Sequence, residues 1–377
     1  MIEVLFISSI LLIPFAYFGY PASLWLIGMV RKNAVKKESF FPDVTMIITA
    51  YNEEKRIKEK LDNTVALDYP KDKLHVLVAS DGSSDQTNFI ITTFENDGIE
   101  LLAIEERHGK ENAQKEAVKR ARGDILVFTD VATTLDSTGL KEIVSNFADS
   151  SVGCVSSEDR VIREDGNAGG EGLYVRYEMW LRRLESQANS LVGLSGSFFA
   201  ARKEVCQDFS EKMQSDFRTV LNSAKLGLRG VSDPMAIGHY LDVSDEKREF
   251  DRKVRTVVRG LTVFFRHLEL LNFFRYGLFS YQFFCHKLLR WLVPLFLFTA
   301  FFTNLILAMT SSAYYVLLLC QSAFYAVAVW GWQRKVPPGN VLLKIPMYFL
   351  TVNASIFVAW RQYLKGERIV MWTPSER

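Results

Sequence analysis

The chain has 377 residues, of which 49% are hydrophobic and 28 are phenylalanine, and its formal net charge is +2. The near-neutral charge excludes a generally basic nucleic-acid binder, because such proteins gain affinity from many phosphate contacts. The apolar content excludes a disordered chain. Cys154, Cys206, Cys285 and Cys320 are widely spaced and form no CxxC pair, so the sequence predicts reduced thiols and not a zinc site or a disulfide framework.

The apolar residues are concentrated in three segments. Residues 4–30 include no charge over 27 positions, more than the ~20 that span a bilayer, and no basic residue precedes them as in a signal peptide. Residues 291–333 form a second uncharged run of 43 positions with Ser311 and Ser312 near its middle, which predicts a hairpin of two spans. A third run, 345–360, has only 16 uncharged residues, and we expect an interfacial or re-entrant segment there, with a span as the alternative.

Basic residues flank these segments, and their positions predict the orientation. They are Arg31, Lys32, Lys36 and Lys37 after the first run, Lys287 and Arg290 before the hairpin, and Arg334 and Lys335 after it. Positive charges collect on the cytoplasmic side, so the sequence predicts a multi-pass protein of the cell or inner membrane with a cytosolic domain. The predicted organisation is a membrane helix at 1–30, the cytosolic domain at 31–260, an amphipathic interfacial segment at 261–290, the hairpin at 291–333, and the third apolar segment with the C-terminal tail at 334–377.

Within the cytosolic part, short β-rich runs alternate with helical segments. The predicted strands are 44–49, 74–79, 100–104, 124–129 and 152–156, and helices are expected at 53–66, 85–95 and 111–122. This order predicts an α/β fold with a mostly parallel sheet and helices on both faces. Ligands of such sheets bind beyond the carboxyl ends of the strands.

Polar residues follow each of the first four predicted strands. Tyr51 and Glu53 follow the first, Asp81 the second, Lys110 the third and Asp130 the fourth. These groups suit a ligand with a base and ribose to hydrogen-bond and phosphates to neutralise. No GxGxxG follows the first strand and no GxxxxGK[ST] occurs, which disfavours a dinucleotide oxidoreductase and excludes a P-loop NTPase.

In this order the segments resemble the family 2 glycosyltransferases, the group that contains cellulose, chitin and hyaluronan synthases. ITAYNE at 48–53 is similar to the family's first-strand signature, SDGSSDQT at 80–87 to its DDGSxDxT motif, and GKENA at 109–113 to its GKxxA element. The resemblance implies the GT-A fold, a Rossmann-like mostly parallel sheet with flanking helices, over about 35–260.

The resemblance also implies roles for these residues. Tyr51 and Glu53 would help hold the nucleotide, Asp81 would accept a hydrogen bond from a uracil nitrogen, and Lys110 would line the donor site. Taken alone, the same residues are explained as a helix start, a turn and a solvated lysine.

The family's metal motif is incomplete in this chain. A DxD sequence binds the divalent cation in the family, and here Asp130 is present while Ala132 replaces the second acid. The resemblance implies Mg²⁺ or Mn²⁺ at Asp130, completed by water and phosphate oxygens. His239 could add a ligand, although a lone histidine is more often structural.

Two downstream segments resemble the family's acceptor side. The first is residues 193–197, here called the glycine strip; its small residues would let an acceptor approach the backbone, and a plain strand with a bulge is the alternative. Its predicted acceptor-loop residues are Gly193, Ser195, Gly196 and Ser197. The second is Asp216, which resembles the catalytic base of the ED or TED motif, with Ser215 in place of the preceding acid; a helix N-cap is the alternative.

A basic helical stretch follows. Arg252, Arg255 and Arg259 lie at i, i+3 and i+7, on one face of a helix. The stretch resembles the family's Q/RxxRW element, with Thr256 in place of its tryptophan, and the resemblance implies that Arg252 and Arg255 bind the nucleotide sugar. Attraction of the helix to anionic lipid is the alternative.

The sequence therefore predicts an inverting glycosyltransferase that moves a sugar from a UDP-sugar to a hydroxyl acceptor at the membrane and builds a β-linked exopolysaccharide. The expected partners are the UDP-sugar donor, a polysaccharide or lipid acceptor and membrane lipid, with no nucleic acid. Two alternatives remain: transfer of one sugar to a lipid acceptor, and a catalytically silent subunit that binds nucleotide sugar.

Overall fold

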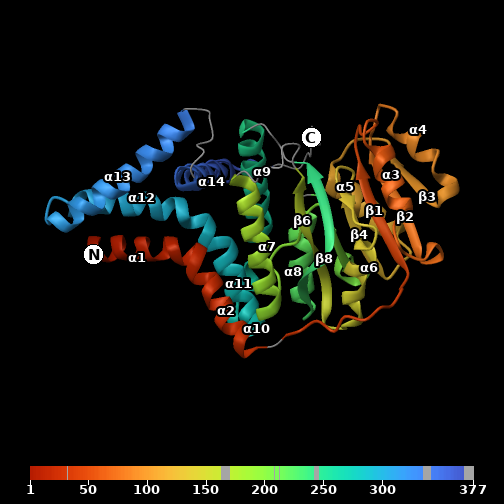
Figure 1. Ribbon diagram of the computed structural model, residues 1–377, viewed down its shortest axis with the longest axis horizontal. Coiled ribbons are helices and arrows are strands. Elements are labelled where there is room, and N and C mark those ends of the chain that lie inside the picture. The colour runs from red at the N-terminus through yellow and green to blue at the C-terminus, as the bar shows by residue number, and fades with distance from the viewer. Residues whose placement is uncertain are drawn as a thin grey trace.

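The computed structural model describes residues 1–31, 33–162, 170–207, 209–211, 213–241, 246–333 and 341–368. Lys32, Arg334, Lys335 and the tail from 369 onward, which entered the expectations above, lie outside the described residues. An eight-stranded sheet with helices on both faces occupies the right-hand part of Figure 1, and long apolar helices extend from it.

The sheet has the strand order β3-β2-β1-β4-β7-β6-β8-β5. The strands are β1 (Val44–Ala50), β2 (Leu74–Asp81), β3 (Ile99–Ile104), β4 (Ile125–Asp130), β5 (Thr134–Leu135), β6 (Val152–Ile162), β7 (Phe198–Arg202) and β8 (Arg229–Leu241). β1 pairs in parallel with β2 and β4, and β2 pairs in parallel with β3. The predicted α/β fold and mostly parallel sheet are confirmed.

Both faces of the sheet are covered, which explains why every residue of β1 is buried. Successive side chains of a strand point to opposite faces. Ile47 accordingly belongs to a core shared with α5 (Lys110–Arg120) and α8 (Ser215–Lys225). Met46 and Ile48 belong to a second core shared with α3 (Ile57–Val65), α4 (Thr87–Thr92) and α6 (Gly139–Ser145).

The half of the sheet beyond β4 is mixed. β7 runs antiparallel between β4 and β6, whereas β8 is parallel to β6 and antiparallel to β5. The sequence pattern did not predict β7, β8 or the full length of β6. β8 contains Pro234, which is atypical of a strand interior, and the register between β6 and β8 shifts twice, so regular alternation is lost there.

The remaining long helices are α7 (Gly170–Ala188) and α9 (Glu246–Phe265), which flank the sheet on its membrane-helix side (Figure 1), followed by the short α10 (Phe273–Tyr276). Three further helical segments are long and apolar enough to cross a membrane: Ile2–Val30, Leu278–Leu307 and Ser312–Gln333. They comprise α1 (Ile2–Pro14) with α2 (Tyr20–Val30), α11 (Leu278–Phe283) with α12 (Arg290–Leu307), and α13 (Ser312–Gln333).

The first of these helices bends at Pro14, because proline has no N–H to donate to the preceding turn of the helix. A π-helical turn, Phe15–Gly19, follows directly and is here called a wide turn. α1 then extends away from the sheet beside α12, so that the N-terminus and the turn between α12 and α13 lie at the same far end (Figure 1). There the rings of Phe6 and Tyr314 lie 5.6 Å apart.

The helix that leads into the hairpin begins at Leu278, earlier than the sequence indicated. A second wide turn, Phe284–Leu289, joins α11 to α12. The charges of Lys287 and Arg290 suggested a polar flank, but both side chains face a cavity inside the protein.

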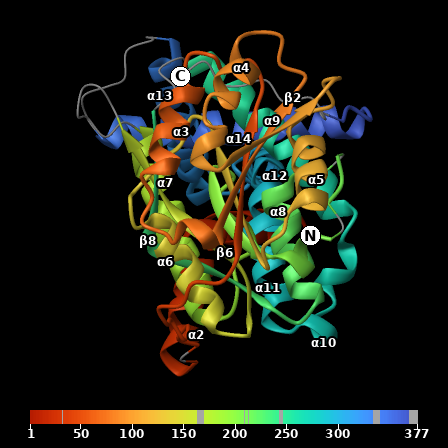
Figure 2. The same ribbon diagram turned by 90° about the vertical axis from the view of Figure 1, so that its right-hand side faces the viewer.

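α14 (Val341–Leu364) is foreshortened in Figure 1 and runs across the width of the view in Figure 2. It therefore crosses α12 and α13, and the interfacial position of this segment stays a prediction. Its inner face packs on α9, where Val254 and Val258 contact Ala359.

Candidate active site

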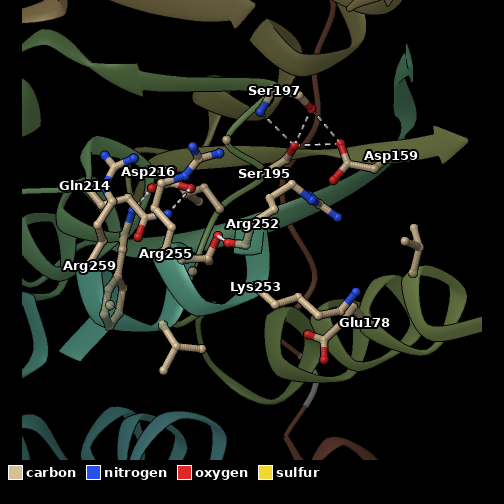
Figure 3. A pocket seen from close by; sticks show the side chains of 18 of the residues that line it. Asp159, Glu178, Ser195, Ser197, Gln214, Asp216, Arg252, Lys253, Arg255 and Arg259 are labelled. Atoms are coloured by element: carbon tan, nitrogen blue, oxygen red, sulfur yellow. Dashed lines mark hydrogen bonds between the residues drawn. The ribbon is translucent and has the colours of Figure 1, made fainter. Parts of the chain in front are cut away.

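A cavity of about 490 Å³ lies where the carboxyl ends of β1 and β4 meet the glycine strip, the start of α8, one face of α9, and α7 (Figure 3). Most of the residues predicted to form the site line it. They are Glu53, Lys110, Asp130, Gly193, Ser195, Gly196, Ser197, Asp216, Arg252 and Arg255. Tyr51 and Asp81 are not among its lining residues.

The turns after β1 and β2 are joined by hydrogen bonds. Asn52 adopts a left-handed conformation with φ +50°; its backbone N–H donates to Ser83 Oγ at 3.1 Å, and its side-chain oxygen accepts from the backbone N–H of Ser84 at 2.9 Å. The next residue, Glu53, donates its backbone N–H to Thr87 Oγ1 at 2.7 Å. The YNE and SDGSSDQT motifs are therefore one structural unit.

Glu53 and Tyr51 each contact an arginine side chain. The Glu53 carboxylate accepts from Arg56 Nε at 2.8 Å, and burial raises the pKa of Glu53 although Arg56 opposes that rise. The Arg107 guanidinium lies 3.7 Å from the centre of the Tyr51 ring.

Asp81 supports the loop that presents Lys110. Its side chain is buried, and its two oxygens accept from the backbone N–H groups of His108 at 2.9 Å and Gly109 at 2.7 Å. Gly109 has φ +98°, a conformation that glycine allows without strain, and α5 begins at the next residue. Recognition of uracil by Asp81 stays a prediction.

Lys110 connects three elements at the centre of the cavity. Its ammonium pairs with Asp130 at the end of β4 and donates to the carbonyl oxygen of Gly196 at 3.2 Å. Beneath them Lys60 donates to Thr129 Oγ1 at 3.0 Å and to the Thr133 carbonyl oxygen at 2.6 Å. Burial lowers the pKa of Lys60 to about 7, while the Asp130 charge opposes that decrease.

The fit of a divalent cation depends on Asp130. His239, the further candidate ligand, instead lies 2.8 Å from Asp136 through its Nε2 atom. Among the described residues, no group of three or more His, Cys, Asp and Glu side chains is arranged to hold a metal ion. Mg²⁺ commonly uses one or two carboxylates together with water and substrate phosphates, so Asp130 fits as the protein ligand of a cation that arrives with a diphosphate.

Asp216 lies in the first turn of α8, directly behind the glycine strip. A Cβ atom on Gly196 would lie only 2.9 Å from Asp216 Oδ2, so a larger residue at this position would displace the carboxylate. Gln214 Nε2 donates to Oδ2 at 3.2 Å and the Phe217 N–H donates to Oδ1 at 2.8 Å. Burial raises the pKa of Asp216 while Lys110 and Lys287 oppose the rise, and a carboxylate with a raised pKa suits a general base.

The glycine strip is a loop, because β7 begins only at Phe198. Asp159 of β6 fixes it: its Oδ1 atom accepts from Ser195 Oγ at 2.6 Å and from Ser197 Oγ at 3.0 Å (Figure 3). The sequence did not single out Asp159, since it lies beyond the predicted end of its strand and resembles an ordinary surface acid.

The arginines of α9 have different partners. Arg252 Nε donates to Glu249 at 2.6 Å, and Arg259 pairs with Glu111 of α5. Arg255 also lines the cavity, and among the described residues it makes no hydrogen bond or ion pair; burial and the neighbouring Arg252 charge lower its pKa. Arg255 is thus available to bind an anion.

The long apolar helices form the other wall of the cavity. Tyr17 and Trp291 line it, and Arg290 Nη2 donates to Glu178 Oε1 of α7 at 2.6 Å. Lys287 lies 4.8 Å from the centre of the Phe217 ring. Sequence analysis assigned Lys287 only to topology, but a lysine within a long apolar helix is itself a signal for a functional site.

Residues 45–209 match the sequence family described as Glycosyl transferase family 2. This part of the chain is a family 2 glycosyltransferase domain. It includes every predicted site residue up to Ser197, whereas Asp216, Arg252 and Arg255 lie beyond the matched range.

The family 2 domain has relatives among known polysaccharide synthases. Poly-beta-1,6-N-acetyl-D-glucosamine synthase of Staphylococcus aureus is 28% identical over 225 residues, which cover 55% of this chain and 54% of the relative. The synthase of the same name from Staphylococcus epidermidis is 24% identical over 201 residues. The chain thus spans about half the length of these relatives.

A solved structure shares the fold over almost the whole chain. The mannosyltransferase PcManGT of Pyrobaculum calidifontis, in complex with GDP-Man and Mn²⁺, superposes with a TM-score of 0.74 and covers 98% of this chain and 100% of its own. The identity is 23%, so this likeness establishes the fold.

Proposed function

We propose that the chain is an inverting glycosyltransferase that moves a sugar from a UDP-sugar to a hydroxyl acceptor at the membrane and builds a β-linked exopolysaccharide. One observation carries the proposal: Lys110, Asp130 and Asp216, from three separate elements, line one cavity at the carboxyl edge of the sheet. The staphylococcal relatives, which are named as synthases of a β-1,6-linked polymer, support the polymeric product.

The donor diphosphate would lie between Lys110, Arg255 and Asp130. Lys110 and Arg255 supply positive charge for the leaving group, and Arg255 has the geometry to form charge-assisted hydrogen bonds with phosphate oxygens. A divalent cation held by Asp130 would neutralise further charge on the diphosphate. Tyr51 and Glu53, which follow β1, and Asp81, which ends β2, would form the nucleoside end of the site.

Asp216 would act as the base. Its carboxylate lies against Gly196, where small residues leave room for an acceptor. It would take the proton from the acceptor hydroxyl while that oxygen attacks the anomeric carbon opposite the leaving diphosphate. A single displacement inverts the configuration, so an α-linked UDP-sugar gives a β-linked product.

Transfer of one sugar to a lipid acceptor is the second candidate function. It is favoured by the cavity wall, because Tyr17 from the first apolar helix, Trp291 of α12 and Ser355 of α14 all reach the cavity. Product analysis with labelled UDP-sugars and purified protein distinguishes the two. A ladder of polymers is expected, a single glycolipid would support the lipid acceptor, and absence of any product would favour a silent binding subunit.

We further propose a multi-pass arrangement with the catalytic domain in the cytosol. The N-terminus and the α12–α13 turn both lie at the end of the apolar helices that is remote from the sheet, which supports this arrangement (Figure 1). Lys287 and Arg290 lie at the end near the sheet, and positive charges collect on the cytoplasmic side. Phe273 and Phe274 of α10 are 62% and 101% exposed beside Arg275, a composition typical of an interfacial anchor.

Replacement of both phenylalanines by serine should weaken the interfacial anchoring of α10. We expect Phe273→Ser/Phe274→Ser protein to stay in membranes through its apolar helices but to lose about half of its activity on vesicles, because the cavity shifts relative to the bilayer. Activity in detergent should equal that of the unchanged protein. An equal loss in detergent would contradict an anchoring role.

Removal of divalent cations should suppress turnover. With EDTA we expect product formation to fall at least ~100-fold, because several kcal/mol of charge stabilisation at the leaving diphosphate are lost, and added Mg²⁺ or Mn²⁺ should restore it. Full activity in EDTA would remove Asp130 from the proposed role as metal ligand.

A further inference from the structure

Lys287 lines the cavity from an apolar helix, as Arg290 does, and has no polar partner among the described residues, as is the case for Arg255. It comes from the wide turn Phe284–Leu289 of a helix apolar enough to span a membrane. Such turns insert a residue into a helix and frequently mark functional sites. Among the described residues the Lys287 ammonium makes no hydrogen bond and no ion pair within 4 Å, although it lines the cavity.

The lysine ammonium lies close to the first turn of α8, which carries the base. Its ammonium lies over the ring of Phe217, the residue next to Asp216, at 4.8 Å from the ring centre. A Cβ atom on Gly193 would lie 2.9 Å from Lys287 Nζ, just as one on Gly196 would lie 2.9 Å from Asp216 Oδ2. Lys287 and Asp216 therefore rest against the same glycine strip, at two positions three residues apart.

The charges around the two groups are complementary. Lys110 of α5 and Lys287 both favour the ionised form of Asp216 and lower its pKa against the effect of burial. Around Lys287 itself lie the acids Glu178 and Glu185 and the arginines Arg182 and Arg290. Arg290 contacts Glu178 at 2.6 Å and His286 contacts Glu185 at 2.6 Å, so both acids already have hydrogen-bonding partners other than Lys287.

We propose that Lys287 is a positioning residue for the transfer reaction: its ammonium, brought in by an apolar helix, rests against the same glycine strip as the Asp216 carboxylate and keeps that carboxylate ionised. This inference rests on the proposed function of Asp216. It also gives the apolar helix a role in the chemistry beyond anchoring, because a shift of the Phe284–Leu289 turn would move the cation away from the base.

The test compares pH profiles of kcat for Lys287→Met, Lys287→Arg and the unchanged protein. Loss of the ammonium leaves burial opposed by Lys110 and by the hydrogen bonds from Phe217 and Gln214, so the pKa of the base rises and the acid limb of the profile moves to higher pH. We expect a shift of about one pH unit, with about tenfold lower activity on the acid limb and convergence of the rates at high pH. Lys287→Arg should restore most of the activity.

Two further measurements make the result decisive. The affinity for UDP should change by less than twofold, since Lys287 lies on the acceptor side. Gly193→Ala should reproduce the pH shift without removal of the lysine, because the new methyl group displaces the ammonium. Lys119→Met is the matched control: this lysine is exposed on α5 and pairs with Glu116 away from the cavity.

A Lys287→Met profile that coincides with that of the unchanged protein, or that falls equally at every pH, would overturn the inference. If the protein is not a glycosyltransferase, the result is different, because the unchanged protein then makes no product from any nucleotide sugar.

Discussion

Asp216→Asn should abolish sugar transfer while UDP binding is retained. The amide keeps the shape of the side chain and can still accept the 2.8 Å hydrogen bond from the Phe217 N–H, but it cannot take a proton from the acceptor. We expect kcat to fall by ~10³–10⁴-fold, the upper range for loss of a general base. Single-turnover transfer from a labelled UDP-sugar measures this loss, and titration calorimetry with UDP measures binding.

The pH dependence provides an independent check on the same group. Because burial raises the pKa of Asp216, the base is ionised only above that raised value. Activity should therefore fall as the pH decreases through a value above the ordinary range for aspartate. Substantial transfer by Asp216→Asn protein would show that another group is the base.

Lys110→Met should damage both donor binding and turnover. The substitution removes the cation that pairs with Asp130 and that contacts the Gly196 carbonyl at 3.2 Å. The donor and acceptor sides then lose their shared contact, and the leaving diphosphate loses a positive charge. We expect kcat/KM to fall by ~10²–10³-fold, as for loss of one preorganised electrostatic group, and the Kd for UDP to rise.

Lys119→Met on the same helix is again the control, since the exposed Lys119 bonds Glu116 near the end of α5 and does not line the cavity. Equal losses in the two variants would point to damage of α5 and not to a role at the cavity. Normal UDP affinity together with normal turnover in Lys110→Met would exclude Lys110 from the donor site.

The parallel half of the sheet was predicted well from the sequence, because each of its strands is recognisable from a short run of consecutive residues. Each of the strands β1 to β4 is a largely apolar run with polar residues at its end or soon after it, so the chain itself indicates both the strand and the polar residues at its carboxyl end. The site residues on those edges, Glu53, Lys110 and Asp130, do meet in one cavity. Their individual roles stay predictions.

The rest of the site depends on contacts that are distant in the sequence. Asp159 reaches the glycine strip only because β6 continues past its apolar part, and its partners Ser195 and Ser197 are 36 and 38 positions away. Lys287 lies in the π-helical turn Phe284–Leu289 of an otherwise apolar helix and lines the cavity. Neither position follows from local periodicity.

The most direct test of the account is a structure of the protein with UDP and Mg²⁺ bound. The account predicts a diphosphate between Lys110, Arg255 and the cation on Asp130, with uracil toward Tyr51 and Asp81 and the Asp216 carboxylate facing the empty sugar position. A nucleotide bound outside this cavity, with Lys110 and Asp130 still paired to each other, would contradict it.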